Sequence, residues 1–191
     1  MSRLTRMAAL LVIVSAPLAA APLFGPPERL NVFLSGGRSI QNWHGQADVD
    51  AINFELIRDW SRRTEVGFVV SPMRIRQPRS WFGNTYGDPD ETARALSGSL
   101  LIRHRFMIES KHMQPYIELS TGPMWATRRV PAATSHFNFI SQAGFGAVFA
   151  PNRPMSFVLG YRMAHVSNGG YSPRNPGLNI HTIVFGTRIR P

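Results

Sequence analysis

Two residues near the C-terminal end of the chain have the types and the spacing that nucleophilic catalysis needs. His165 and Ser167 are separated by a single residue. On a β-strand such a pair shares one face, with Cα atoms roughly 6.5–7 Å apart. An imidazole base in that position can reach toward the serine hydroxyl, which is the minimum geometry for a serine nucleophile. The alternative is that a polar pair at the end of a strand only supports a loop or an interface.

Composition removes several other kinds of chemistry. The 191 residues include no cysteine, which excludes a disulfide scaffold, a thiolate zinc site, an iron–sulfur cluster and cysteine catalysis. The last acidic residue is Glu118, and residues 119–191 contain neither Asp nor Glu. A hydrolytic site around His165 must therefore work without a carboxylate from its own part of the sequence.

The elements that must position this pair are β-strands. Apolar residues alternate with polar or small ones, which is typical of strands with two different faces. The alternation predicts eight strands and no helix, at 30–37, 52–60, 65–72, 99–108, 116–120, 137–149, 155–164 and 182–189. His165 and Ser167 continue the apolar row of the seventh strand, formed by Phe157, Leu159, Tyr161 and Met163.

The connections favour a membrane barrel over a soluble barrel or sandwich. Short turns near 61–64, 109–113 and 150–154 alternate with longer segments, as in outer-membrane barrels. The polar faces carry Gly, Ser, Asn and Gln with scattered Glu and Arg, and we expect Glu55, Glu118 and the arginines to pair inside a narrow lumen. The prediction is an all-β, eight-stranded antiparallel up-and-down transmembrane β-barrel over residues 22–191. A soluble periplasmic lipid-binding barrel is the alternative.

This architecture predicts the surroundings of the candidate pair. Apolar rows of a membrane barrel face lipid, so His165 and Ser167 are expected on the lipid-facing wall. The seventh strand runs outward, which places the pair near the outer-leaflet interface. A reactive pair in that position implies a lipid substrate.

Residues 1–21 are expected to be a secretory signal peptide. Arg3 and Arg6 precede an apolar run at 7–14, and residues 15–21 are mostly small, as export and cleavage require. The chain has a formal net charge of +10, and such a basic excess is often a sign of nucleic-acid binding. Because an exported chain meets little nucleic acid, we expect no nucleic-acid partner. The expected location is the outer membrane.

The residues around the pair resemble a known family. His165-x-Ser167-Asn168-x-Gly170 is followed by Asn175-Pro176-Gly177-x-Asn179, and this looks like the signature of the PagL-type lipid A 3-O-deacylases. The resemblance covers about residues 97–190 in order. It includes the upstream segments Pro115-Tyr116-Ile117-Glu118, Phe137-Asn138-Phe139, Ala143-Gly144-Phe145-Gly146 and Gly160-Tyr161-Arg162.

The resemblance implies an outer-membrane serine esterase that removes the 3-O-linked acyl chain of lipid A in lipopolysaccharide. Ser167 would be the nucleophile and His165 the base, and Asn168 with Gly170 would form the oxyanion hole. No metal or other cofactor is implied. The partner is lipid A of the outer leaflet, and the resemblance does not give the oligomeric state.

One position departs from the family. The third triad residue, fourteen residues after the histidine, is a Glu in the best-known form and is Asn179 here. An Asn carbonyl can still orient an imidazole, as in Cys-His-Asn enzymes, but it cannot stabilise the imidazolium by charge. We therefore expect either a slower esterase, with Asn179 as its third catalytic residue, or a non-catalytic structural or adhesive barrel of the same family.

Arginines and tryptophans are expected to meet the membrane surface. Because lipid A carries phosphates and guanidinium groups bind phosphate well, Arg128, Arg129 and Arg174 are candidate phosphate contacts. They belong to a set expected in the long outward loops, completed by Arg74, Arg76 and Arg79. Trp43, Trp81 and Trp125 are expected to form an interfacial aromatic belt. His181 lies on the same face as Asn179 and is expected to be an interfacial polar residue, with a role as an additional partner of the site as the alternative.

Overall fold

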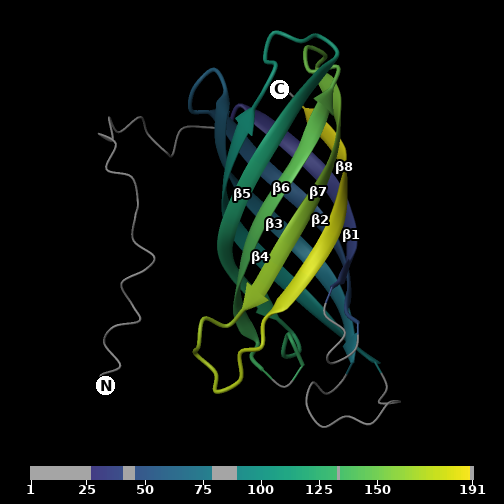
Figure 1. Cartoon of the computed structure of the whole chain (residues 1–191), viewed down its shortest axis with the longest axis vertical. Coiled ribbons are helices and arrows are strands. Elements are labelled where there is room, and N and C mark those ends of the chain that lie inside the picture. Colours follow the sequence, from purple (N-terminus) through teal and green to yellow (C-terminus); the bar gives the residue numbers. More distant parts are fainter. Residues whose placement is uncertain (1–26, 41–45, 79–89, 133, 190–191) are drawn as a thin grey trace, which may run out of the picture.

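The chain forms eight long strands. The computed structural model describes residues 27–40, 46–78, 90–132 and 134–189, and the predicted signal peptide, Arg79, Trp43 and Trp81 lie outside these ranges. The strands are β1 Arg29–Ser39, β2 Asp48–Asp59, β3 Thr64–Pro78, β4 Asp90–Arg105, β5 Met113–Ala126, β6 Phe137–Phe149, β7 Met155–Ser167 and β8 Leu178–Ile189. Figure 1 shows them tilted around one long axis.

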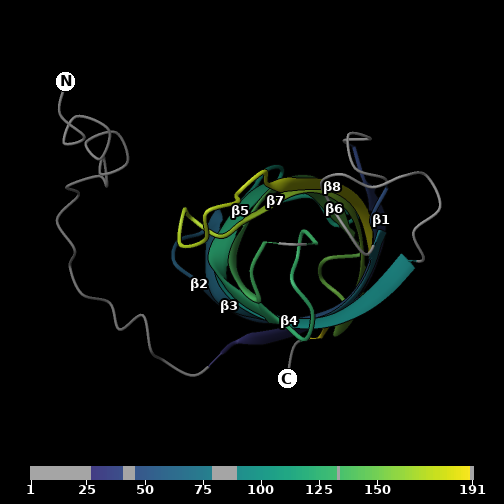
Figure 2. The same ribbon diagram turned by 90° about the horizontal axis from the view of Figure 1, so that it is seen from below.

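The eight strands close into a barrel. Each strand pairs antiparallel with the next, and β1 pairs with β8, so the view along the axis in Figure 2 is a ring. Closure leaves no strand edge unpaired, which a membrane barrel requires because lipid offers the backbone no hydrogen-bond partner. The predicted eight-stranded antiparallel barrel is confirmed. Within the described ranges, no helix has the length and apolarity that a membrane crossing would need.

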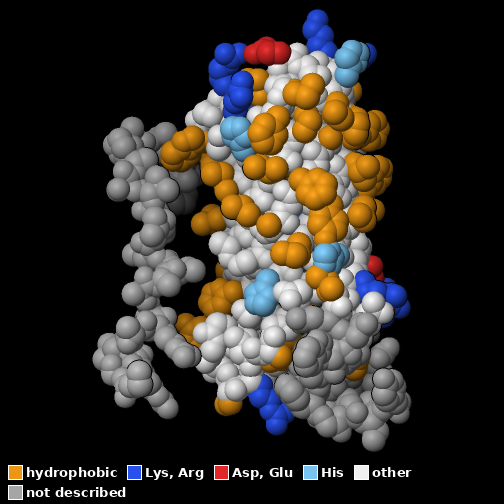
Figure 3. All heavy atoms as spheres, viewed as in Figure 1, with side chains coloured by type: hydrophobic (Ala, Val, Ile, Leu, Met, Phe, Trp, Pro, Cys, Tyr) orange, Lys and Arg blue, Asp and Glu red, His pale blue; other side chains and the backbone are white. Residues whose placement is uncertain are grey.

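Apolar side chains cover the outside of the barrel. In β7, Phe157, Leu159 and Met163 are 51%, 50% and 46% exposed, whereas Val158 and Arg162 of the opposite parity are 1% and 4% exposed. Figure 3 shows hydrophobic side chains over the middle of the barrel, with lysine and arginine side chains gathered toward its two ends. A soluble protein would bury this surface, so the wall fits a lipid environment.

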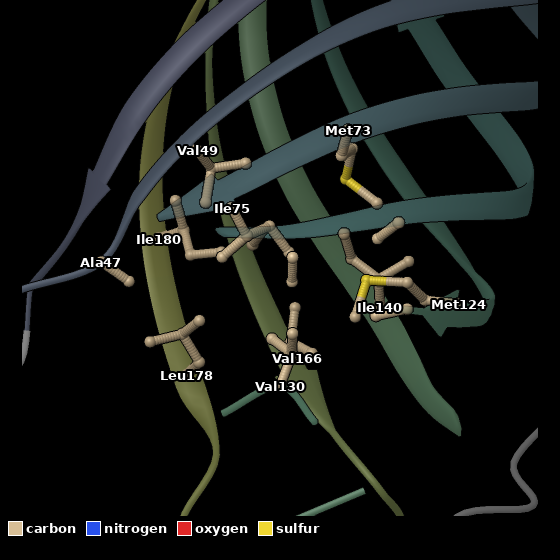
Figure 4. Packing of buried hydrophobic residues seen from close by; sticks show 14 of the residues in the cluster. Ala47, Val49, Met73, Ile75, Met124, Val130, Ile140, Val166, Leu178 and Ile180 are labelled. Carbon is tan, nitrogen blue, oxygen red and sulfur yellow. The ribbon is translucent and has the colours of Figure 1, made fainter. Parts of the chain in front are cut away.

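Charged and apolar clusters fill different parts of the lumen. Buried ion pairs link Glu55 and Glu118 to both Arg103 and Arg162, which confirms the predicted pairing of these carboxylates with arginines. A separate apolar cluster, shown in Figure 4, brings Val49, Ile75, Val166 and Ile180 toward one another. The cluster also includes Val130 of the β5–β6 connection, so this connection folds inward toward the lumen.

The connections are sorted by length, as predicted. Residues 40–47, 79–89, 127–136 and 168–177 connect strands at one end of the barrel, which we call the loop end. Residues 60–63, 106–112 and 150–154 connect them at the other end, which we call the turn end. The site residues at the end of β7 and the start of β8 therefore lie at the loop end, at the bottom of Figure 1.

Several strands are longer than predicted, mainly at the loop end. β4 begins at Asp90 rather than at residue 99. Residues 90–98 are mostly polar or small, but they still pair with β3. It ends at Arg105, so the prediction that the strand includes Ile108 was wrong, and Met107 adopts a positive φ of 49° in the turn. Arg74 and Arg76 were predicted in a loop, but they lie in the extended part of β3.

Candidate active site

His165 and Asn179 face each other across two neighbouring strands. They are direct partners in the β7–β8 register, and their side chains lie on the outer face of the barrel. The distance from His165 Nδ1 to Asn179 Oδ1 is 2.7 Å. Because the amide oxygen only accepts, Nδ1 carries the ring proton and donates it. This tautomer leaves Nε2 with a free lone pair, which is the form that a general base needs.

Ser167 is the last residue of β7 and lies on the same outer face. It is half-buried and pairs with Phe139 of β6. In the described part of the chain no hydrogen bond joins Ser167 Oγ to His165. Such bonds are often long in the free enzyme and tighten when substrate binds, so the shared face is the relevant observation. The predicted position of this pair on the lipid-facing wall agrees with the structure.

Gly177 supports the imidazole from the loop side. Its φ is +73°, and a Cβ built there would lie 2.7 Å from His165 Cε1 and 3.4 Å from Nε2. The ring therefore packs directly over the glycine backbone, which holds the ring plane beside Asn179. Gly177 is part of the sequence motif, but the spacing of the motif does not predict its contact with the histidine.

Asn168 organises the connection between β7 and β8. Its side chain is fully buried. Asn168 Nδ2 donates to Arg174 O at 2.8 Å, Asn168 Oδ1 accepts from Gly170 N at 2.9 Å, and Asn168 N donates to Asn175 Oδ1 at 3.0 Å. Three bonds from one residue thus fold the loop that follows Ser167. In this arrangement the Gly170 N–H points into the loop, and Asn168 Nδ2 keeps one further N–H.

The three candidate phosphate contacts lie in two linked loops at the loop end. Arg128 and Arg129 are exposed in the β5–β6 connection, and Arg174 is exposed in the β7–β8 connection. Ser172 Oγ donates to Thr134 O at 3.3 Å, which joins the two connections. Trp125, the described member of the predicted aromatic belt, is 56% exposed at the end of β5.

Two neighbours of the site were not assigned to it from the sequence. Ser141 of β6 is the direct cross-strand partner of His165 and is exposed on the same face. His181 lies two residues after Asn179 on β8, and its ring centroid is 5.5 Å from that of Tyr161. The sequence shows only that both side chains fall on the outer face by alternation. Their position beside His165 and Asn179 depends on the register between strands.

Comparison with known proteins agrees with the motif and the fold. The family model "Lipid A 3-O-deacylase (PagL)" matches residues 39–188. The crystal structure of the outer membrane enzyme PagL superposes with a TM-score of 0.56 at 17% identity, covering 84% of this chain and 99% of that one. Neisserial surface protein A superposes with a TM-score of 0.60 at 12% identity, covering 85% and 96%.

At these identities the two structures establish the barrel fold alone. A comparison with curated proteins gave no match. The family model covers most of the chain, including every residue of the His165–Asn179 motif. The chain therefore belongs to the PagL family of lipid A 3-O-deacylases.

Proposed function

We propose that this protein is a serine esterase of the outer membrane that removes the 3-O-linked acyl chain of lipid A. The observation that carries the proposal is the hydrogen bond of 2.7 Å between His165 Nδ1 and Asn179 Oδ1, on the face that also carries Ser167. A base held in the correct tautomer beside a serine, and turned toward lipid rather than water, suits an ester in a membrane lipid. The loop end then faces the outer leaflet.

The proposed reaction has two steps. Ser167 Oγ attacks the acyl carbonyl carbon while His165 Nε2 accepts the hydroxyl proton. Collapse of the tetrahedral intermediate breaks the bond to the 3-oxygen of the sugar, which takes the proton from His165 and leaves as an alcohol. Water, activated by the same imidazole, then releases the fatty acid from Ser167. Asn168 Nδ2 and Gly170 N are the proposed oxyanion donors. The Asn168 side chain is fully buried and Gly170 N is bonded to Asn168 Oδ1, so the loop would have to rearrange on substrate binding before either could reach the oxyanion.

The arginines of the two linked loops are proposed to hold the lipid A phosphates. Arg128, Arg129 and Arg174 are exposed at the end of the barrel where the candidate site lies, and guanidinium groups form paired hydrogen bonds with phosphate oxygens. Binding the headgroup there would keep the acyl ester at the level of His165. No cofactor takes part in the proposed steps.

The direct test is a mass spectrum of lipid A from cells that express the protein in their outer membrane. We expect a new lipid A species that is lighter by one 3-O-linked acyl chain, compared with cells that carry an empty vector. Heat-dependent gel mobility of the barrel in the same membranes shows that the protein is folded. An unchanged acyl pattern in cells with folded protein would reject the proposal.

Replacing Asn179 with glutamate is expected to increase the rate of deacylation about tenfold. A carboxylate at this position would stabilise the imidazolium that forms when His165 takes the serine proton, and a hydrogen bond to a charged group contributes about 1.5–3 kcal/mol. The rate of fatty acid release by purified wild-type and Asn179→Glu protein measures this. The matched control is Asn175→Asp, which adds a negative charge in the nearby loop, where the Asn175 side chain accepts from Asn168 N.

A non-catalytic barrel of the same family is the second candidate function. The observation that favours it is the neutral amide of Asn179 in place of a carboxylate. It predicts that Asn179→Glu, folded and present in the membrane, leaves the lipid A spectrum unchanged. Acyl loss caused by the wild-type protein would eliminate this candidate.

A further inference from the structure

The outer wall of the barrel contains an open groove away from the candidate active site. It has a volume of about 820 Å³ and extends over β8, β1, β2, β3 and β4. Its apolar walls are formed by Leu34, Ile52, Pro72, Ile183 and Phe185. Most of a membrane barrel's wall is evenly covered by side chains, so a hollow of this size in the lipid-facing surface needs an explanation.

The local sequence explains the hollow. Gly36 lies on the outer face of β1 between Leu34 and Arg38 and has no side chain to fill the space. Among the described residues other than its two chain neighbours, a Cβ built at Gly36 would meet only Asp50 Oδ1 within 4 Å, at 3.7 Å. Pro72 has no N–H to donate, and the β2–β3 pairing is interrupted beside it. The groove is therefore part of the strand architecture rather than a product of one side-chain conformation.

The end of the groove nearest the loop end is positively charged. Arg74 and Arg94 both line it and are direct partners across β3 and β4. Arg74 pairs with Asp50 at 3.0 Å, whereas the described residues provide no carboxylate partner for Arg94. Because like charges at directly opposite positions repel, this pair of arginines is stabilised when an anion lies between them.

One strand connects the groove to the candidate active site. On the outer face of β8, Asn179 is followed by His181, and then by Ile183 and Phe185, which form a groove wall. At about 3.4 Å per residue, the groove begins about 14 Å from the His165–Asn179 pair. Arg74 and Arg94 lie three and four strands farther around the barrel than β8, roughly 14–19 Å at about 4.8 Å per strand, so the charged end of the groove is a separate site from the His165–Asn179 pair.

We propose that this groove binds an acyl chain of a phosphorylated lipid A molecule, with a phosphate of that molecule held by Arg74 and Arg94. The inference rests on the proposed function for the identity of its ligand. The groove faces the membrane, so its apolar occupant is an acyl chain, and its charged end lies toward the leaflet surface, where a lipid phosphate lies. Since lipid tails surround the whole wall, shape and charge rather than hydrophobicity select the occupant.

The test measures binding in a Ser167→Ala background, so that no turnover occurs. Native mass spectrometry of the purified barrel gives the Kd for bisphosphorylated, hexa-acylated lipid A. Gly36→Phe fills the groove without a backbone clash, and Arg94→Ala removes one of its two guanidinium groups. Each is expected to raise the Kd about tenfold. The matched controls are Leu119→Phe, on the lipid-facing surface of β5, and Arg62→Ala, at the turn end, and both are expected to bind as the parent does.

The ligand is varied in the same assay. Lipid A without its phosphates is expected to bind the parent more weakly, and this difference should become smaller in Arg94→Ala because the two changes remove a shared contact. Phosphatidylglycerol is expected not to displace lipid A at equal concentration.

An unchanged Kd in folded Gly36→Phe, or displacement by phosphatidylglycerol, would overturn the assignment. Weaker binding in both groove variants, together with an unchanged lipid A spectrum from expressing cells, would reject the esterase proposal and leave the groove as a lipid A site.

Discussion

Replacing Ser167 with alanine is expected to abolish deacylation, with a rate at least about 10⁴-fold below that of the wild-type protein. The hydroxyl is the proposed nucleophile, and the proposed reaction assigns this role to no other residue. Release of the 3-hydroxy fatty acid from lipid A in detergent micelles measures the rate. A fluorophosphonate probe, followed by intact-protein mass spectrometry, should add one label to the wild-type protein and none to the variant.

Ser141→Ala is the matched control for this prediction. Ser141 has the same side chain, lies on the outer face of the adjacent strand and pairs directly with His165. We expect its replacement to leave both the rate and the labelling close to those of the wild-type protein. Equal deacylation by Ser167→Ala and wild-type protein would show that Ser167 is not the nucleophile.

Replacing Glu55 with glutamine is expected to destabilise the barrel by about 3–5 kcal/mol, because it leaves buried arginines with too few negative partners. Glu55 is fully buried and contacts Arg103 at 2.8 Å, Arg162 at 2.5 Å and Asn31 at 2.9 Å. Glutamine keeps the size of the side chain, so the loss reports charge rather than a cavity. The urea concentration at the unfolding midpoint in lipid vesicles, followed by gel mobility, measures the change in stability.

Glu109→Gln provides the comparison for an exposed ion pair. Glu109 pairs with Arg62 at 2.8 Å, and both side chains are 82% exposed, so we expect its loss to cost less than about 1 kcal/mol. If Glu55→Gln and Glu109→Gln unfold at the same urea concentration, the interior network does not stabilise the barrel.

The fold could be predicted because two independent patterns agreed. Period-two alternation in β6, β7 and β8 is long and regular, and the alternation of short and long connections sorts the two ends. The ends of the strands could not be predicted, because the apolar rows stop where the membrane stops while the hydrogen-bonded ladder continues. Arg74 and Arg76 illustrate this, since polar residues on an exposed strand extension have the composition of a loop.

The candidate site was predicted in part. Parity alone placed His165 and Ser167 on the outer face, whereas the importance of Asn179 came from the resemblance to the family. The direct pairing of His165 with Asn179 depends on the β7–β8 register, and the packing of Gly177 under the imidazole depends on loop conformation. The groove was missed for a related reason. Its residues come from five strands, and only the closed register brings Gly36 beside Ile183.

The filled lumen has a consequence for the permeability of the membrane that contains the barrel. Among the described residues, an interior cavity lined in part by Ala51 and Arg162 has a volume of about 20 Å³, close to the minimum for one water molecule. The ion pairs and the apolar cluster therefore form a plug that a hydrated ion or a nutrient cannot pass. Many copies of a barrel closed in this way can be inserted into a membrane without making that membrane more permeable.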